Sequence, residues 1–312
     1  MKNNAKVTVL GSFVVDLMGR TPHLPTAGET VKGSVFKLGP GGKGSNQAVA
    51  AKRIGANVTM ITKIGKDDFA DIALDNFKLE GMDCTYIYRD NNRPTGAALI
   101  MVDEVTSQNI ILVTLGACEN INEQEIENAR ISIEKADVFL SQLETNIDAV
   151  EFAVNIAYEA GVRVVLNPAP VQPIADYLYK KINVFIPNEV EASLLSGITL
   201  DSSNSILQAA QVFLDKGVEN VIITLGGEGA LIANHETHLF INAIPVNVVD
   251  TTGAGDAFTG AFATALAEGK DVFQAAKFAS AAAALSVTKI GTAPAMAYRD
   301  EVEEFIRMNN QE

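Results

Sequence analysis

Short runs of apolar, β-branched residues alternate along the chain with longer stretches that repeat apolar positions every three or four residues. Runs of the first kind are typical of buried strands, and the second pattern predicts helices. The predicted strands are Val7–Leu10, Val58–Ile61, Val138–Leu140, Val162–Leu166, Val184–Ile186 and Val221–Leu225. The predicted helices are Asn46–Ile54, Ile147–Ala160 and Ser205–Lys216, each followed by a capping glycine. This alternation predicts an α/β fold with a mostly parallel sheet covered by helices on both faces.

Two stretches, Glu29–Leu38 and Gly96–Leu115, break that alternation. Both have a β-rich composition with partial apolar–polar alternation, and neither contains a helical pattern. They predict a small antiparallel sheet projecting from the main body. We therefore expect one domain over residues 1–312, with a lid formed by roughly residues 13–40 and 96–115.

The acidic composition limits the classes of partner. The chain has 312 residues, 47% of them hydrophobic, and its 38 acidic and 24 basic residues give a net charge of −14. Such a chain is not suited to nucleic acid or an anionic membrane as its main partner. A polyanion such as ATP would need positive potential made locally by backbone amides, a helix N-terminus or a metal.

Cysteine usage and the termini predict a cytoplasmic protein. Cys84 and Cys118 form neither a metal-ligand pattern nor a disulfide framework, which fits a reducing compartment. Met1–Asn4 leads directly into the first apolar run without a signal-peptide pattern. The nearly uncharged stretch Phe278–Thr288 is too short to span a bilayer.

The segment Asp250–Asp256 carries the strongest chemical signal. A predicted strand, Ile244–Val249, leads into Asp250-Thr-Thr-Gly-Ala-Gly-Asp256, and a helix is predicted to begin near Ala257. Glycines at a helix start let backbone N–H groups approach an anion, whose charge the helix dipole favours. Asp256 would stay ionised there and accept a proton from a hydroxyl. The alternative is that Asp256 only caps the helix.

A second glycine-rich segment, Gly39-Pro-Gly-Gly-Lys-Gly-Ser-Asn46, precedes a predicted helix. The P-loop pattern fails, because Lys37 stands where the first glycine belongs and Gly44 follows Lys43. G-x-G-x-x-G is present but is a weak signal alone. The segment fits a polyhydroxylated ligand lying against the glycines, with Lys43 and Asn46 as donors. A flexible turn before a helix is the competing interpretation.

Three further strand ends carry polar residues. Asp16 follows the first strand in Gly11-Ser-Phe-Val-Val-Asp16 and suits diol recognition, although a solvated aspartate is equally common there. Asn188 and Glu191 lie three positions apart and could orient phosphate or hydrated Mg²⁺, or simply cap a helix. Ile223–Gly229 ends a strand in a glycine-rich turn suited to a nucleotide, or is only a turn.

Taken in this order, the segments resemble the ribokinase branch of the PfkB carbohydrate kinase family. The likeness runs from Gly11 to about Pro294. The matching stretches are Gly41–Asn46, Asp250–Asp256, Pro25–Thr30, Gln142–Glu144, Asn167–Pro170, Asn188 with Glu191, and Thr224–Gly226. The resemblance implies a Rossmann-like α/β body with a small β-sheet lid. It also implies ATP-dependent phosphorylation of a sugar's primary hydroxyl, with D-ribose the first candidate and 2-deoxyribose, another furanose or a nucleoside left open.

The same resemblance implies a role for each matching residue. Asp256 would be the base, and the amides of Gly253, Ala254 and Gly255 would form an anion hole. The sugar contacts would be Asp16, Gly42, Lys43, Asn46, Glu144 and Asp256. Asn188, Thr224, Gly226, Gly229 and Gly255 would hold ATP, and Glu191 would serve Mg²⁺ and phosphate. Asp250, Thr252, Ser286, Lys289 and Gly291 would hold a monovalent cation such as K⁺. A homodimer formed through the lid is also implied.

Three positions depart from the family pattern. Val14 stands where many members of this branch have Asn, and it cannot hydrogen-bond a sugar hydroxyl, so it weakens the expectation of ribose. Ala295 stands where the cation loop often offers a serine hydroxyl. Pro40 precedes the double glycine, and nothing in the sequence explains its effect.

Two other classes of protein remain open. A dinucleotide-dependent oxidoreductase would use Gly39, Gly41 and Gly44, but its glycine fingerprint should directly follow the first strand, where only Gly11 occurs. A catalytically silent sugar-binding regulator would not need an intact Asp256 after its Gly-Ala-Gly turn.

Overall fold

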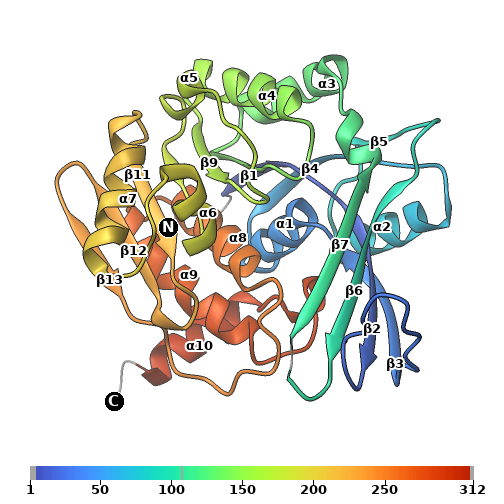
Figure 1. Cartoon of the computed structure of the whole chain (residues 1–312). Helices are drawn as coiled ribbons and strands as arrows, with labels where there is room; N and C mark the ends of the chain where they lie inside the picture. The colour runs from blue at the N-terminus through green and yellow to red at the C-terminus, as the bar shows by residue number, and fades with distance from the viewer. Residues whose placement is uncertain (1–4, 107, 310–312) are drawn as a thin grey trace.

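The computed structural model describes residues 5–106 and 108–309. Its main body is a nine-stranded sheet in the order β13-β12-β11-β10-β9-β8-β1-β4-β5 (Figure 1). The strands are β1 (Lys6–Leu10), β4 (Asn57–Ile64), β5 (Ile87–Arg89), β8 (Val138–Gln142), β9 (Arg163–Asn167), β10 (Val184–Phe185), β11 (Asn220–Thr224), β12 (Ala230–Asn234) and β13 (His238–Ile241). Only the β11–β12 and β12–β13 pairs are antiparallel. The predicted α/β class with a mostly parallel sheet is confirmed.

Helices cover both faces of this sheet. They are α1 (Lys43–Arg53), α2 (Asp68–Leu79), α3 (Glu123–Glu134), α4 (Ile147–Glu159), α5 (Asp176–Tyr179), α6 (Glu189–Ser196), α7 (Ser203–Asp215), α8 (Ala254–Ala267), α9 (Val272–Ser286) and α10 (Arg299–Asn309). Three 3₁₀ turns are η1 (Ala117–Asn120), η2 (Gly226–Glu228) and η3 (Ala293–Ala295). None of the described helices is long and apolar enough to cross a membrane.

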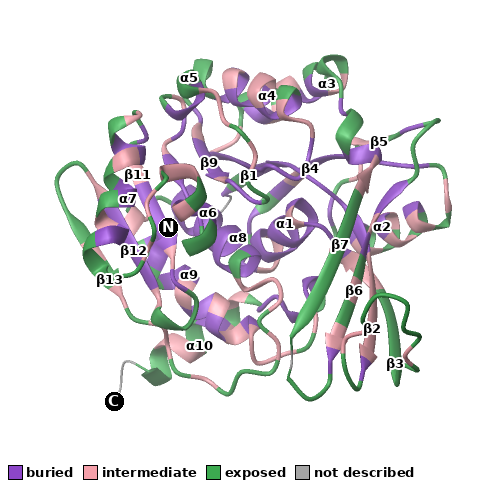
Figure 2. Ribbon diagram, in the orientation of Figure 1, coloured by how far each residue is buried: buried purple, intermediate pink, exposed green. Residues whose placement is uncertain are grey.

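The apolar runs of the strands divide between two cores. On β8, Leu140 belongs to the core that includes residues of α1, α2, α8, α9 and α10, whereas its neighbour Phe139 belongs to the core with residues of α3 to α7. Successive side chains of a strand point to opposite faces, so a strand buried on both faces reads as a continuous apolar run. Figure 2 shows the resulting buried centre between two layers of helices. The predicted strands were recognisable because both faces exclude water.

A second sheet of four strands projects from the body at the right of Figure 1. We call it the small sheet: β3 (Val35–Gly41), β2 (Val14–Thr21), β6 (Thr95–Asp103) and β7 (Asn109–Gly116), in that order. The predicted segments do pair, but the expectation of a purely antiparallel sheet was wrong, because β2 and β6 run parallel. This parallel pairing joins the antiparallel pair β2–β3 to the antiparallel pair β6–β7, and both pairs begin at the end of the sheet next to the body.

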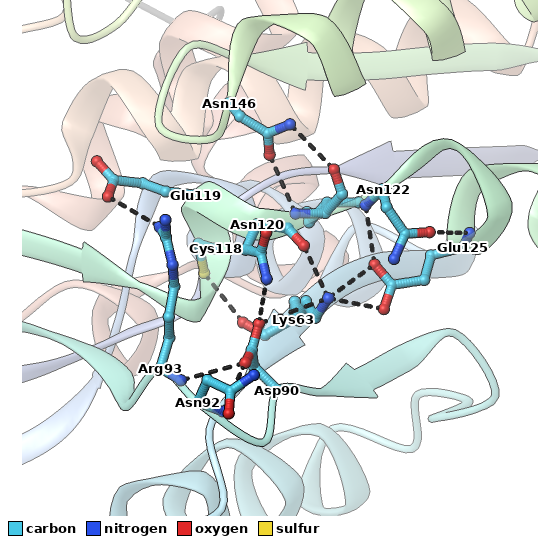
Figure 3. A network of polar contacts seen from close by, with 11 residues as sticks. Lys63, Asp90, Asn92, Arg93, Cys118, Glu119, Asn120, Asn122, Glu125 and Asn146 are labelled. Atoms are coloured by element: carbon cyan, nitrogen blue, oxygen red, sulfur yellow. Dashed lines mark hydrogen bonds and ion pairs between the residues drawn. The ribbon is translucent and has the colours of Figure 1, made fainter.

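Lys63 on β4 fastens the β6–β7 hairpin to the body (Figure 3). The Lys63 ammonium is 5% exposed and donates to the carbonyl of Asn120 (2.7 Å) and to the carboxylate of Glu125 (2.9 Å). Asp90 lies 3.6 Å from the same ammonium and accepts from the Asn120 side chain and the Asn92 backbone. The Asn120 and Asn92 hydrogen bonds lower the pKa of Asp90 to about 2. Because Asn92 precedes β6 and Asn120 follows β7, one cluster holds both ends of the hairpin.

The predicted strand Ile244–Val249 is wrong, since this segment is irregular. Pro245 has no N–H for a strand ladder, and the side chains of Val248 and Val249 are exposed. The Val249 N–H instead donates to the carbonyl of Val287, at the end of α9 (2.7 Å). The apolar β-branched residues of this segment therefore have the composition of a strand, but no strand of the sheet lies beside them.

Candidate active site

Asp256 lies in the first turn of α8, which begins at Ala254, three residues earlier than predicted. The N-cap of that helix is Gly253, so the alternative that Asp256 serves as its cap is wrong. The Asp256 carboxylate is 7% exposed and accepts from two amides on α1, Asn46 Nδ2 at 2.9 Å and Gln47 Nε2 at 3.0 Å. An aspartate held by two donors retains lone pairs for a further hydrogen bond.

The start of α8 forms one wall of a pocket. The pocket is lined by Lys43, Asn167, Ala169, Ile186, Asn188, Glu191, Thr224, Thr251, Gly253, Ala254, Gly255, Asp256 and Thr259. Gly253 has a φ of 80°, a conformation that favours glycine, and a Cβ on Gly255 would meet only open space. The amide of Ala254 already donates to the Thr251 carbonyl at 3.3 Å. The amides at such a helix start lack intrahelical acceptors and favour an anion.

Three carboxylates surround Lys43 at this pocket. They belong to Asp256, Glu144 and Glu191, and they raise the pKa of the Lys43 ammonium although burial acts in the opposite direction. Glu144 is buried and accepts from the Ser12 hydroxyl (2.5 Å) and the Lys43 backbone N–H (2.8 Å). Burial raises the pKa of Glu144. The site therefore combines one cation with several acceptors in a partly desolvated space.

Asp16 approaches the site from β2 of the small sheet, and not from the end of β1 as the sequence suggested. Burial raises the pKa of its carboxyl to about 6, and the charges of Glu144 and Asp256 act in the same direction. A Cβ on Gly41 would lie 2.2 Å from Asp16 Oδ1, and Gly42 has a φ of 88°. The double glycine therefore makes room for the Asp16 carboxylate against the backbone.

Asn188 and Glu191 form a capping box at the start of α6. The side-chain amide of Asn188 donates to Glu191 Oε1 and the Asn188 backbone N–H donates to Oε2, both at 2.9 Å. The alternative that these two residues cap a helix is therefore correct. Both residues also line the pocket, as does Thr224. Gly226 begins the turn η2 after β11 and Gly229 directly follows that turn, and neither is part of the described pocket wall.

The predicted cation residues gather partly around Asp250. Its carboxylate accepts from the backbone N–H groups of Thr252 and Gly291, both at 3.0 Å. These hydrogen bonds lower the pKa of Asp250 although burial opposes them. The Lys289 side chain turns away to Glu301 (2.7 Å), and the Ser286 hydroxyl donates to the Ala283 carbonyl. Lys289 could therefore serve a cation only through its backbone carbonyl, whereas the Ser286 hydroxyl oxygen keeps lone pairs. Within the described residues, no group of three His, Cys, Asp or Glu side chains is suited to a metal.

Sequence reasoning assigned no role to Gln47, Thr292 or Ser12. Gln47 binds Asp256, the Thr292 hydroxyl lies 3.2 Å from Asp16 Oδ2, and Ser12 binds Glu144. Gln47 directly follows Asn46 in the same helical turn, which was a usable signal. Thr292 had none, because it meets Asp16 across 276 positions of sequence.

A glycine-rich helix start beside a buried aspartate, a lysine and several hydroxyl acceptors has the chemistry that phosphoryl transfer to a polyhydroxylated substrate requires. The comparisons identify its family: the pfkB family carbohydrate kinases match residues 4–297, and the chain belongs to this family. It is an ATP-dependent sugar kinase, a transferase.

Individual relatives resemble this chain along nearly its whole length. The ribokinase of Haemophilus influenzae is 41% identical over 300 residues, covering 96% of this chain and 98% of that protein. The deoxyribokinase of Salmonella typhimurium is 38% identical over 304 residues, covering 97% and 99%. The structure of Arabidopsis thaliana ribokinase complexed with ribose and ATP has a TM-score of 0.86 and 30% identity, covering 97% and 98%.

Proposed function

We propose that this enzyme transfers the γ-phosphoryl group of ATP to the primary hydroxyl of a pentose, D-ribose being the first candidate. The main support is the buried Asp256 carboxylate at the pocket wall, with its two oxygens held by Asn46 and Gln47. In that position it would accept the proton of the attacking hydroxyl. The similarity to ribokinases along the whole chain supports ribose as the substrate.

The sugar would lie between Asp256 and the small sheet. Its contacts would be Asp16 on β2, the residues Gly42, Lys43 and Asn46 at the start of α1, and Glu144 after β8; of these, Lys43 lines the described pocket. The Oδ1 atom of Asn46 is buried and has no partner among the described residues, although its Nδ2 is bound to Asp256. A buried acceptor without a donor costs free energy, and a sugar hydroxyl would satisfy it.

The phosphoryl group would sit at the start of α8. The amides of Gly253, Ala254 and Gly255 would act as its anion hole, assisted by the Lys43 ammonium. Gly255 is the best placed, since the Ala254 amide already has an acceptor. These groups would supply the positive potential that an acidic chain lacks elsewhere.

The nucleotide would lie toward α6 and β11, with Asn188, Thr224, Gly226, Gly229 and Gly255 as contacts. Each Glu191 oxygen keeps a free lone pair beside its contact with Asn188, so Glu191 fits a hydrated Mg²⁺. Mg²⁺ would neutralise phosphate charge when bound.

A monovalent cation such as K⁺ would lie at the loop of Asp250. The Asp250 carboxylate, whose pKa is lowered, and the backbone carbonyls of Thr252, Ser286, Lys289 and Gly291 would form an all-oxygen donor set, which suits a hard cation. Ala295 supplies no hydroxyl to this set, so backbone oxygens would carry it.

We further propose one kinase domain over residues 1–312, acting in the cytoplasm as a homodimer whose interface is the small sheet. Strand register places a group of exposed apolar side chains on the face opposite Asp16. They are Phe36, Leu38, Leu99, Met101, Ile110 and Leu112, with 37% to 69% of each exposed. An exposed apolar face of this kind favours association. In a homodimer, the apolar face of each copy would be covered by that of the other.

A 2-deoxypentose is the second candidate substrate. Val14 is 2% exposed, and a Cβ on Gly96 would lie 2.8 Å from its Cγ1, so this position offers no hydrogen bond to a hydroxyl. A site without such a donor would discriminate weakly against a sugar that lacks one hydroxyl. The similarity to a deoxyribokinase agrees with this alternative.

A coupled assay of ADP release tests the proposal with ribose, 2-deoxyribose, fructose, tagatose 6-phosphate and nucleosides, each with ATP and Mg²⁺. We expect the highest kcat/KM for ribose, with 2-deoxyribose next. A preference for a hexose phosphate or a nucleoside would contradict the pentose assignment. Equal rates in potassium, sodium and cation-depleted buffer would contradict the cation site.

A further inference from the structure

Gln47 contacts Asp256 without lining the pocket. Its side chain is fully buried on α1, and within the described chain the pocket wall includes Asp256 but not Gln47. Gln47 Nε2 donates to Asp256 Oδ1 and to Asn167 Oδ1, both at 3.0 Å. Gln47 Oε1 accepts from Gln142 Nε2 at 2.6 Å. Its amide therefore uses both donors and its acceptor within the protein.

The surrounding groups determine the orientation of this amide. Asn167 Nδ2 donates to the Ile186 carbonyl at 2.7 Å, so Asn167 must turn its oxygen toward Gln47. Both oxygens of Asp256 also act as acceptors, from Asn46 Nδ2 and from Gln47 Nε2. With acceptors on both sides, Gln47 must present its NH₂ group to them and its oxygen to Gln142. A flipped Gln47 would place oxygen against oxygen at Asp256 and at Asn167.

Gly260 lets the two helices come close enough for this contact. It lies one turn after Asp256 on α8, and a Cβ there would be 2.4 Å from the Gln47 carbonyl and 2.6 Å from Ala50 Cβ. The helices α1 and α8 accordingly lie side by side in the centre of the molecule (Figure 1). The neighbouring residues Asn46 and Gln47 can then each hold one oxygen of Asp256.

We propose that Gln47 is a positioning residue that fixes the rotamer of Asp256 without touching the sugar. This inference rests on the proposed role of Asp256 as the base. Its neighbour Asn46 has a buried acceptor left for substrate, whereas Gln47 has none. Without the Gln47 donor, the carboxylate would lose one of its two supports and could turn toward Lys43. Proton transfer depends on such alignment, and misplacement lowers turnover more than binding.

Two variants of the full-length enzyme test this inference. Gln47→Met removes the donor at similar volume and should lower kcat by about 10- to 100-fold, with the sugar KM within about threefold of wild type. Gln47→Glu sets a second carboxylate against Asp256, and it should also move the acidic limb of the pH–kcat profile to higher pH. The other charged groups near Asp256 are Asp16, Lys43, Glu144 and Glu191, and both variants retain them.

Gln172→Met is the matched control, since Gln172 donates to the Leu143 carbonyl outside the pocket wall. Its kcat and pH profile should match wild type. Unchanged kcat and an unchanged acidic limb in the Gln47 variants would overturn the inference. So would a loss of kcat accompanied by an equal rise in sugar KM and a lowered Tm, because that result indicates a structural role. If Gln47→Met does not fold, the pH–kcat profile of the isosteric Gln47→Glu tests the inference by itself, and an unmoved acidic limb would overturn it.

The assay uses whichever sugar of the panel the wild type phosphorylates best, so an incorrect choice of pentose does not affect it. Asp256→Asn is measured in parallel. Full activity of Asp256→Asn would refute the proposed base and this inference together. An inactive Asp256→Asn beside a fully active Gln47→Met would refute only the role of Gln47.

Discussion

The hydroxyl of Thr292, in the loop after α9, lies 3.2 Å from the Asp16 carboxylate on β2. The same hydroxyl lies 3.2 Å from the Pro40 carbonyl on β3, so it can donate to either strand of the small sheet. The adjacent Gly291 N–H donates to Asp250. Two consecutive residues of one loop thus contact the proposed sugar site and the proposed cation site.

Replacing Thr292 should therefore affect sugar binding. Thr292→Val removes the donor to Asp16 at nearly constant volume, and we expect the sugar KM to rise about three- to tenfold, as for a hydrogen bond worth about 1 kcal/mol. The kcat should stay within about twofold, because Asp256 is not contacted. Steady-state kinetics with Thr237→Val, an exposed hairpin residue, as the control measures this. A drop in kcat at constant KM would contradict it.

The raised pKa of Asp16 predicts a pH-dependent sugar KM. Its carboxyl has a pKa of about 6 because it is buried, so it is ionised at pH 7.5 and largely protonated at pH 5. The protonated form accepts fewer hydroxyl hydrogen bonds, and the KM should rise about tenfold per pH unit below 6. The variant Asp16→Asn should have a high KM that does not change over this range. A KM of the wild type that is constant from pH 7.5 to 5 would refute the prediction.

The same shift predicts that Asp16 destabilises the fold at neutral pH. A carboxyl whose pKa is raised in the folded state costs stability above about pH 6, and this cost disappears as the pH falls toward the ordinary value of 3.8. Asp16→Asn should therefore raise the Tm at pH 8 and have little effect at pH 4. Thermal unfolding at both pH values measures the difference, and an equal effect at both would contradict it.

Asp256→Asn keeps the size of the side chain but removes its basicity. We expect turnover to fall by about 100- to 10,000-fold, the contribution of a positioned general base. Sugar affinity, measured by calorimetry, should change by less than about threefold. Turnover within a factor of a few of wild type would refute the assignment of the base.

Leu112 tests the proposed dimer interface. It is 60% exposed on β7, on the apolar face opposite Asp16. Leu112→Arg should convert a dimer into a monomer at micromolar concentration, since an unpaired charge in an apolar interface is costly. Light scattering after size exclusion measures the mass. Ile131→Arg is the control, because Ile131 is 63% exposed on α3. A wild-type monomer would contradict the interface.

Much of the main body was predictable because its signals are local. Strands such as Val138–Leu140 are buried on both faces and therefore apolar throughout. The parallel pairing of β2 with β6 was not predictable, since it joins segments about 80 residues apart and leaves no local pattern. The false strand Ile244–Val249 has the composition of a strand, and Pro245 together with the missing neighbour excludes it.

The candidate site divides in the same way. Asp256 and Lys43 stand in glycine-rich helix starts whose anion-binding chemistry is visible in the sequence. The orientation of Asp256 depends on Gln47, which is adjacent in space only because α1 and α8 cross at Gly260. Contacts of this kind arise from helix packing, so no motif records them.

All four connections of the small sheet to the body lie in one transverse row. Val14 begins β2 and pairs with Gly41 at the end of β3 and with Gly96 on β6, while Gly116 ends β7 opposite Thr95. A plate whose chain connections lie on a single line turns about that line more easily than in any other direction. Asp16, two residues from this line, would then move a short distance. The apolar end of the small sheet farthest from the line would move a long one. The proposed sugar contact would thereby be among the least displaced parts of the plate.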